Sequence, residues 1–280
     1  MHILSMDIGG TNIKSGIFLD NNLFDSFVTE TNASSGFINI LNSIDEVYQH
    51  YFLIYKDIEI ITISTAGDID YINGICRYAS DNLKGFTGFK IKEYIEREYK
   101  VKCYVNNDAV CHLLGILNDN NINKDIFMIT LGTGVGAVLY KNKEIYYGEN
   151  FNLGRFAHYT INKFGMKCDC GKRGCAEKEL SICYLKKEIQ NKYHYEMSVK
   201  NLFDLYLEKD KKAISILKKY FRKLNKFLEF VDSLGVDIIY ISGGIANSTL
   251  IFKEFIKNKK VEYVKDNDLL GVYGAIKLIK

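Results

Sequence analysis

Four side chains near the middle of the chain have the types and spacing of metal ligands. His158, Cys168, Cys170 and Cys175 lie within eighteen positions, in the stretch HYTINKFGMKCDCGKRGC, and two glycines between the last two thiols would let the loop curl around a centre. Thiolate sulfur and neutral imidazole suit Zn²⁺, and four protein ligands close its coordination shell, which predicts a structural zinc site. A cluster of free or disulfide-linked cysteines is the alternative.

A first glycine-rich turn, running from Asp7 to Lys14 as DIGGTNIK, has the composition of a phosphate site. Gly9 and Gly10 would let backbone N–H groups approach phosphate oxygens, and Thr11 adds a hydroxyl donor. Asp7, at the end of a predicted strand, would hold Mg²⁺ through water. The alternative is a plain hairpin turn, because the turn is neither a GxxxxGK[ST] loop nor a GxGxxG helix start.

Two further glycine turns follow apolar strands. Gly132, Thr133 and Gly134 begin the run GTGVG, and together with the first turn they would form two cradles for one phosphate chain. Gly243 and Gly244, in IIYISGGIAN, would leave bare backbone against which a flat ligand such as adenine could lie. A strand-to-helix turn also needs a glycine for its own geometry, so this third turn has a structural interpretation as well.

Between the first two turns, Asn107 and Asp108 end the predicted strand KCYVNND and precede the helical pattern AVCHLLGIL. Phosphoryl transfer requires alignment of donor and acceptor, charge neutralisation and one acceptor for the hydroxyl proton. Asp108 could supply that acceptor. Either residue could instead cap the following helix, and spacing alone does not separate the two roles.

The elements that must position these residues alternate between short β-branched runs and amphipathic helical patterns. Strands are predicted at residues 2–10, 13–20, 58–65 and 102–108, and helices at 39–55 and 89–99. From residue 125 the design restarts, with a strand, glycine turn and strand over 125–140 and a third strand at 143–147. The repetition predicts two similar α/β lobes, with a nucleotide between the two turns.

Composition is that of a soluble globular protein: 280 residues, 47% hydrophobic and 25% charged, with a net charge of +3. The densest basic stretch, Lys211 to Phe227, has apolar residues at helical spacing, which favours an amphipathic helix over a nucleic-acid patch. The apolar start is a strand rather than a signal peptide, and no run reaches membrane-spanning length. We therefore expect a cytoplasmic protein without nucleic-acid or membrane partners, whose other cysteines are free thiols.

The motifs DIGGTNIKSGIF, STAGDID, SDNLKGFTGF, NNDAV, TLGTGVGAV, CDCGKRGCAE and SGGIAN occur in the order typical of the ROK family of sugar kinases and sugar-responsive repressors. This resemblance spans nearly the whole chain. It implies an actin-like α/β fold, of the ribonuclease H-like or hexokinase-like kind, with mixed sheets flanked by helices and two lobes around a central cleft. The N-terminal lobe would comprise residues 1–115 plus about 266–280, and the C-terminal lobe residues 116–265.

The resemblance also implies roles for individual residues. ATP and Mg²⁺ would sit over the first two glycine turns, and Asp108 would be the catalytic base for a sugar hydroxyl, usually the 6-hydroxyl. His158 would bind zinc through one nitrogen and contact the sugar with the other side of its ring, so that a structural metal orients a recognition residue. The sugar pocket would further be lined by Gly67, Asn82, Asn107 and Glu177.

One position departs from the family pattern. The family has Gly-Glu-x-Gly-His where this chain reads GRFAH, so that Arg155 replaces the glutamate that accepts hydrogen bonds from sugar hydroxyls. Arginine has no acceptor. Arg155 either points away from the sugar, or faces the pocket and favours an acceptor-rich or anionic substrate. An ion pair with Glu149 or Glu177 is a further alternative.

These observations lead us to expect an ATP-dependent kinase of a hexose or N-acetylhexosamine, with glucose and N-acetylmannosamine as the family's commonest substrates. A homodimer is expected because ROK proteins are commonly dimers. The alternatives are a non-catalytic sugar sensor and a kinase of an acidic or otherwise modified sugar. ROK repressors carry an N-terminal helix-turn-helix, for which the turn beginning at Asp7 leaves no room, and the retention of Asp108 and of both glycine turns also favours a kinase.

Overall fold

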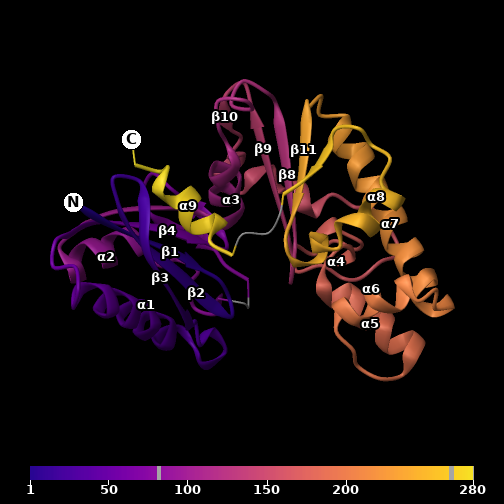
Figure 1. Ribbon diagram of the computed structural model, residues 1–280, viewed down its shortest axis with the longest axis horizontal. Helices are drawn as coiled ribbons and strands as arrows, with labels where there is room; N and C mark the ends of the chain where they lie inside the picture. Colours follow the sequence, from indigo (N-terminus) through magenta and orange to yellow (C-terminus); the bar gives the residue numbers. More distant parts are fainter. Residues whose placement is uncertain (81–82, 265–267, 280) are drawn as a thin grey trace. The chain divides into compact units, whose positions relative to one another are not determined.

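Figure 1 shows a computed structural model of the chain, which describes residues 1–80, 83–264 and 268–279. The chain forms two compact units. Unit 1 comprises Met1–Asp119, Tyr147–Gly154 and Asn267–Lys280, and unit 2 comprises Asn120–Tyr146 and Arg155–Asp266. Within the described ranges, no helix combines the length and the apolar character that crossing a bilayer demands.

Unit 1 contains a five-stranded mixed sheet. Its strands follow the order β3-β2-β1-β4-β7, in which β1 pairs antiparallel with β2 and parallel with β4. The strands are β1 (His2–Ile8), β2 (Asn12–Leu19), β3 (Asn22–Glu30), β4 (Ile58–Thr65) and β7 (Lys102–Asn107), and a separate hairpin joins β5 (Asp68–Asp70) to β6 (Ile75–Tyr78). The helices are η1 (Ala33–Ser35), α1 (Phe37–Phe52), α2 (Ile91–Tyr99), α3 (Asp108–Ile116), η3 (Glu149–Phe151) and α9 (Leu270–Ile276).

Helices cover both faces of this sheet. Leu4 and Met6 of β1 belong to the core that α1 and α2 complete, whereas Ile3, on the other side of the pleat, packs with Val272 of α9. Figure 1 shows α1 and α9 on opposite sides of the strands. Because side chains alternate along a strand, Asp7 points to the same face as Ile3, toward α9.

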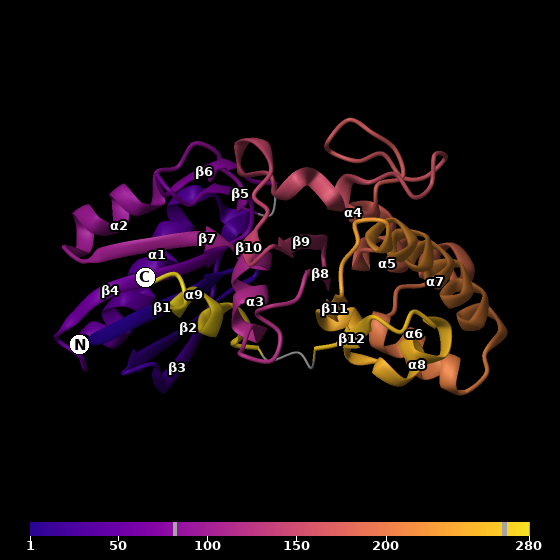
Figure 2. The same cartoon turned by 90° about the horizontal axis from the view of Figure 1, so that it is seen from above.

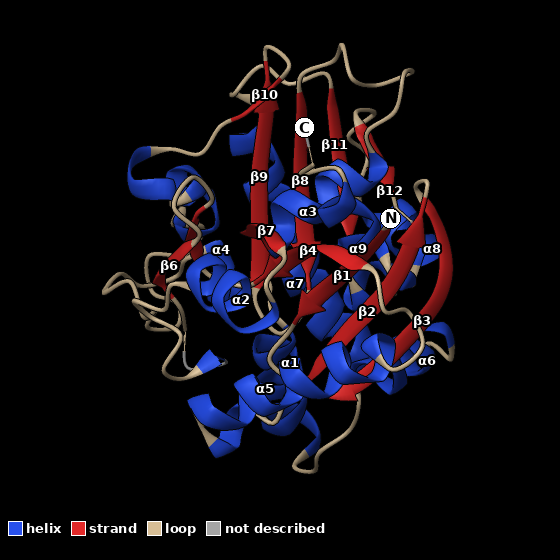
Figure 3. Ribbon diagram, turned by 90° about the vertical axis from the view of Figure 1, so that its left-hand side faces the viewer, coloured by secondary structure: helices blue, strands red, loops and turns tan. Residues whose placement is uncertain are grey.

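Unit 2 contains the second five-stranded sheet, in the order β10-β9-β8-β11-β12. Figure 3 shows its long strands β8 and β9 side by side. The strands are β8 (Ile126–Leu131), β9 (Val135–Lys141), β10 (Glu144–Ile145), β11 (Ile238–Ser242) and β12 (Val261–Tyr263). The helices are η4 (Leu153–His158), which begins in unit 1, α4 (Ala176–Glu179), α5 (Ile182–Tyr193), α6 (Val199–Leu207), α7 (Lys211–Asp232), η5 (Gly244–Asn247) and α8 (Thr249–Phe255).

The basic stretch predicted as an amphipathic helix is α7, which runs on to Asp232. Asp210 caps its start by accepting a hydrogen bond from the Ala213 amide. Apolar residues recur along it every three or four positions and are buried between Ala213 and Val231, whereas most of its lysines are exposed. Both α5 and α6 pack against α7 (Figure 2). The interpretation of this stretch as an amphipathic helix is therefore confirmed.

The two predicted strand–turn–strand units are confirmed as β1–β2 and β8–β9. The predicted third strand at 143–147 is shorter, because Tyr147 leaves the sheet and stacks on Tyr71 with ring centroids 4.2 Å apart. Its hydroxyl also accepts a hydrogen bond from Asn106 at 2.8 Å. These contacts explain why Tyr147–Gly154, which we assigned by sequence to the second lobe, belongs to unit 1.

Candidate functional site

The four predicted metal ligands lie together in unit 2. Their ligand atoms are all within 4.8 Å of one another, with His158 Nδ1 3.4 Å from Cys168 Sγ and the sulfurs of Cys170 and Cys175 3.6 Å apart. Zn–S bonds of about 2.3 Å in a tetrahedral site would place two sulfurs about 3.8 Å apart. The cluster therefore fits Zn²⁺, and the seven cysteines are free thiols in the described part of the chain.

Local contacts shape this metal loop. The amide of Cys168 donates to the Lys172 carbonyl at 2.8 Å, and the amide of Gly171 donates back to the Cys168 carbonyl at 3.0 Å. Burial, followed by the positive charge of Arg155, lowers the pKa of His158. A neutral imidazole is the form that binds a metal, so the surroundings of His158 favour ligation.

Glu179 supports the metal loop, and our sequence analysis missed it. Its carboxylate is buried, with 1% of the side chain exposed, and is paired with Lys223 of α7. It also accepts hydrogen bonds from the Met166 amide at 2.6 Å and from the Asn162 side chain at 3.1 Å. A buried carboxylate is stable only when its acceptor sites are filled. Glu179 therefore fixes the segment that leads into the cysteines, although in the sequence it resembles an ordinary surface acid.

The first glycine turn closes tightly between β1 and β2 in unit 1. The Gly9 amide donates to the Asn12 carbonyl at 3.0 Å, and Thr31 binds the turn from the side through its hydroxyl, which donates to the Gly9 carbonyl at 2.6 Å. Gly10 and Thr11 are exposed, as a phosphate cradle requires. The Lys14 ammonium donates to Asp268 at 3.1 Å, so part of its charge is already neutralised.

Asp7 lies at the start of this turn with three neighbours that sequence reasoning did not connect to it. Ser64 of β4 donates its hydroxyl to one carboxylate oxygen, and His112 Nε2 lies 3.7 Å from the other. A methyl group added at Gly271 of α9 would come within 2.6 Å of the carboxylate carbon. Glycine at this position therefore allows α9 to pack directly against Asp7.

Asn107 and Asp108 divide the two roles that spacing alone left open. Asn107 is the helix cap, since its side-chain oxygen accepts from the amides of Ala109 and Val110, and its side-chain nitrogen donates to the Gly67 carbonyl at 2.8 Å. Asp108 is the first residue of α3, and one oxygen of its carboxylate also accepts the Ala109 amide at 2.8 Å. Gly67 and Asn107, both predicted for the sugar pocket, are therefore in contact.

The carboxyl group of Asp108 has an unusual electrostatic environment. Burial raises its pKa, the nearby negative charge of Asp7 raises it further, and the charge of His112 opposes both. His112 lies one helical turn after Asp108, on the same face of α3. A carboxyl whose pKa is raised by burial beside a second acid has the character of a general base.

The second glycine turn contacts Glu177, the acid two residues after Cys175. The amide of Val135 donates to Glu177 Oε2 at 3.2 Å, and a methyl group added at Gly134 would come within 2.6 Å of Oε1. Glu177 was predicted to contact sugar. The structure places its carboxylate against Gly134, and the sugar contact stays a prediction.

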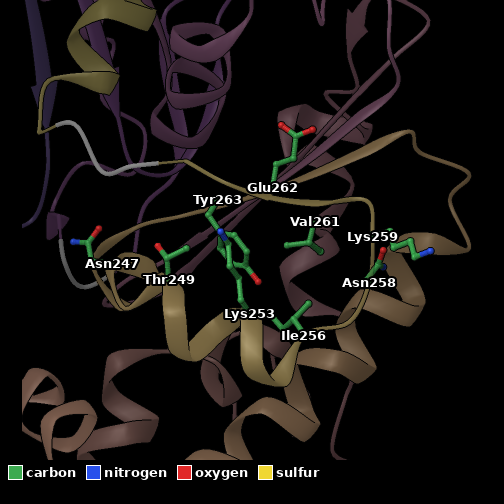
Figure 4. Close-up of a pocket in the computed structure, with 9 residues that line it drawn as sticks. All are labelled: Asn247, Thr249, Lys253, Ile256, Asn258, Lys259, Val261, Glu262 and Tyr263. Atoms are coloured by element: carbon green, nitrogen blue, oxygen red, sulfur yellow. The ribbon is translucent and has the colours of Figure 1, made fainter. Parts of the chain in front are cut away.

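In the third glycine turn, backbone conformation and packing explain the first glycine. Gly243 has φ of 96°, a conformation that favours glycine, and a side chain there would collide with the Leu131 backbone. Gly244 has open space beside it. It begins η5, whose last residue, Asn247, lines a cavity of about 910 Å³ together with Thr249, Lys253 and Tyr263 (Figure 4).

Two predicted sugar-site residues remain. Arg155 is exposed and has φ of 50°, and among the described residues of unit 2 it forms no ion pair with Glu177. Asn82 lies outside the described residues. The predicted site residues described above belong to two units. The first glycine turn, Gly67, Asn107 and Asp108 lie in unit 1, and the other two glycine turns, the metal ligands and Glu177 lie in unit 2.

Comparison with known proteins finds matches over nearly the whole chain. The sequence signature described as "ROK family" matches residues 3–270. A glucokinase of Thermotoga maritima is 24% identical over 99% of this chain and 92% of its own length, and an N-acetylmannosamine kinase of Yersinia pseudotuberculosis is 22% identical over 86% and 82%. The crystal structure of a ROK family glucokinase from Streptomyces griseus, in complex with glucose and AMPPNP, has a TM-score of 0.79 at 20% identity and covers 99% of both chains.

Proposed function

We propose, from the premise that this chain belongs to the ROK family, that it is an ATP-dependent kinase of a hexose or N-acetylhexosamine. The observation that carries the proposal is Asp108. It combines a raised pKa with a position at the start of α3, directly after an asparagine held by Gly67. The names of the relatives, glucokinase and N-acetylmannosamine kinase, support a sugar as the acceptor.

In this proposal unit 1 carries the proton chemistry. The carboxylate of Asp108 takes the proton of the sugar hydroxyl, by resemblance that on O6, as the sugar oxygen attacks the terminal phosphorus of ATP. The bond from that phosphorus to its bridging oxygen breaks, and ADP leaves. Asn107 orients the sugar, because its amide is fixed by Gly67 and by the helix start. Asp7 would hold Mg²⁺ through water, and bound Mg²⁺ would supply positive charge to the phosphates.

Unit 2 carries the second phosphate turn and the recognition residues. The amides of Thr133 and Gly134 would bind the phosphates, whereas the amide of Gly132 closes the turn, and Gly244 leaves room for the nucleoside. Bound zinc would hold His158 and the three cysteines together and so fix the imidazole for its contact with the sugar. Glu177 and Arg155 would then select among sugars.

A coupled-enzyme assay of ADP release tests the proposal. Purified protein is given ATP and Mg²⁺ with glucose, mannose, fructose, N-acetylmannosamine, N-acetylglucosamine or a sugar acid. We expect sugar-dependent ADP release with at least one neutral hexose or N-acetylhexosamine. Release with a sugar acid alone would favour the modified-sugar alternative, and sugar binding without any release would favour a sensor.

A further inference from the structure

The segment that leaves the metal loop also holds the second glycine turn at two points. Residues 132–134 connect β8 to β9, and the turn closes through the Gly132 amide, which donates to the Gly134 carbonyl at 3.0 Å. On one side, Glu177 accepts the Val135 amide at 3.2 Å. On the other, the Ile182 amide donates to the Gly132 carbonyl at 2.8 Å. The shape of the turn therefore depends on residues 177–182.

The contact with Glu177 requires a glycine in the turn. Any side chain at Gly134 would occupy the place of the carboxylate, since its first carbon would come within 2.6 Å of Oε1. The requirement for glycine at position 134 is thus explained without phosphate binding. The carboxylate fills the space beside the turn and accepts one of its amides, and a hydrogen bond to a charged acceptor is stronger than one between neutral groups.

The same segment begins at a metal ligand. Cys175 precedes α4 directly, its neighbour Ala176 donates its amide to the Tyr159 carbonyl at 2.9 Å, and Glu177 follows one residue later. The backbone that carries Glu177 is therefore tied to a metal ligand, since the Lys178 amide also donates to the Cys175 carbonyl at 3.1 Å. Loss of the metal would release Cys175 and, with it, the carboxylate that shapes the turn.

We propose that Glu177 is a positioning residue that couples the metal loop to nucleotide binding by holding the second glycine turn in its binding shape. This inference rests on the proposed function, because it assumes that the turn binds phosphate. A carboxylate has about four acceptor sites, so Glu177 can serve the turn and a sugar hydroxyl at once. Nucleotide binding measured without sugar isolates the first role.

The test compares three variants by calorimetric titration with Mg²⁺ and AMPPNP in the absence of sugar. Glu177→Ala should weaken AMPPNP binding about tenfold, whereas Glu177→Gln, which keeps an oxygen acceptor, should stay within about threefold of wild type. Glu188→Ala is the matched control, because it removes the same charge from α5 at a residue that pairs with Lys219. All three should unfold within a few degrees of wild type.

A second measurement tests the coupling itself. Treatment of wild type with a zinc chelator should weaken AMPPNP binding by a similar factor, and the same treatment of Glu177→Ala should weaken it little further, since the connection is already broken. Equal AMPPNP affinity in wild type and Glu177→Ala would overturn the inference and leave the kinase proposal standing. Wild type that binds AMPPNP but contains no metal, or is indifferent to the chelator, would refute the coupling. No AMPPNP binding by wild type would refute both proposals.

Discussion

Replacement of Asp108 by asparagine separates catalysis from folding at the proposed base. The variant keeps the size of the side chain and an oxygen that can accept from the Ala109 amide, as Asp108 does at 2.8 Å. The helix cap is Asn107, which the change leaves intact. The loss of a helix-terminal charge is worth about 0.3–1 kcal/mol. We therefore expect a stability change within about 1 kcal/mol.

The sign of the pH dependence follows from the raised pKa of Asp108. The carboxyl group of Asp108 binds its proton more tightly in the folded protein than in the unfolded chain. As pH rises from the ordinary pKa of aspartate through the raised pKa of Asp108, the free energy of unfolding therefore falls. In Asp108→Asn the side chain carries no charge in that window. The variant should therefore be as stable as wild type, or slightly more stable, at neutral pH.

Turnover should respond very differently. Removal of a general base costs about 10²-fold or more in kcat, which is about 2.7 kcal/mol of barrier. In wild type kcat/KM should fall as pH drops through the pKa of Asp108, above the ordinary aspartate value, and the variant should lack this limb. The assay is steady-state ADP release from about pH 4.5 to about pH 8.5, with thermal unfolding as the control. Near wild-type turnover with the acid limb intact would refute the assignment of Asp108 as base.

The remaining predictions concern the metal, the packing of α9 and substrate choice. Elemental analysis of tag-free protein should give one zinc per chain, and Cys170→Ser should lower both the zinc content and the melting temperature. Full-length protein that contains no zinc after purification without chelators would contradict the metal site. Gly271→Ala should cost about 1–3 kcal/mol of stability and raise KM for Mg-ATP, because the added methyl group displaces α9 or the Asp7 carboxylate. An unchanged KM would show that this packing does not matter for nucleotide binding. Arg155→Glu should shift kcat/KM about tenfold toward neutral hexoses over an anionic sugar at unchanged stability, and an unchanged ranking over the sugar panel would remove Arg155 from substrate selection.

The parts of the fold that the sequence predicted are those that local pattern determines. Apolar runs of β-branched residues that end in glycine turns predicted β1–β2 and β8–β9, because a strand and its turn are encoded by neighbouring residues. The metal cluster was predictable from the types and spacing of its ligands, since three thiols and an imidazole with glycines between them can close around one ion within a single loop. β3 was not predicted, although its exposure alternates, because two of its four less exposed residues, Asp25 and Thr29, are polar.

The contacts that tune the site escaped prediction because they join distant parts of the chain. Gly271 meets Asp7 from the opposite end of the sequence, and no local pattern signals such an approach. Glu179 was missed because burial, rather than residue type, gives it its role. Contact between Glu177 and the glycine turn likewise depends on how α4 packs beside β9, which spacing does not reveal.

Phosphorus NMR of the reaction mixture tests the central claim, transfer of a phosphoryl group from ATP to a sugar hydroxyl, most directly. Wild-type protein with ATP, Mg²⁺ and the best sugar from the ADP assay should produce a phosphomonoester signal as the terminal phosphate signal of ATP declines. For an aldohexose, coupling of that signal to the two protons of a methylene carbon would place the phosphate on O6, whereas coupling to a single proton would place it on a ring or anomeric oxygen. Asp108→Asn should form the ester at least about 10²-fold more slowly. The appearance of inorganic phosphate alone, with no sugar ester from any sugar in the panel, would contradict the account.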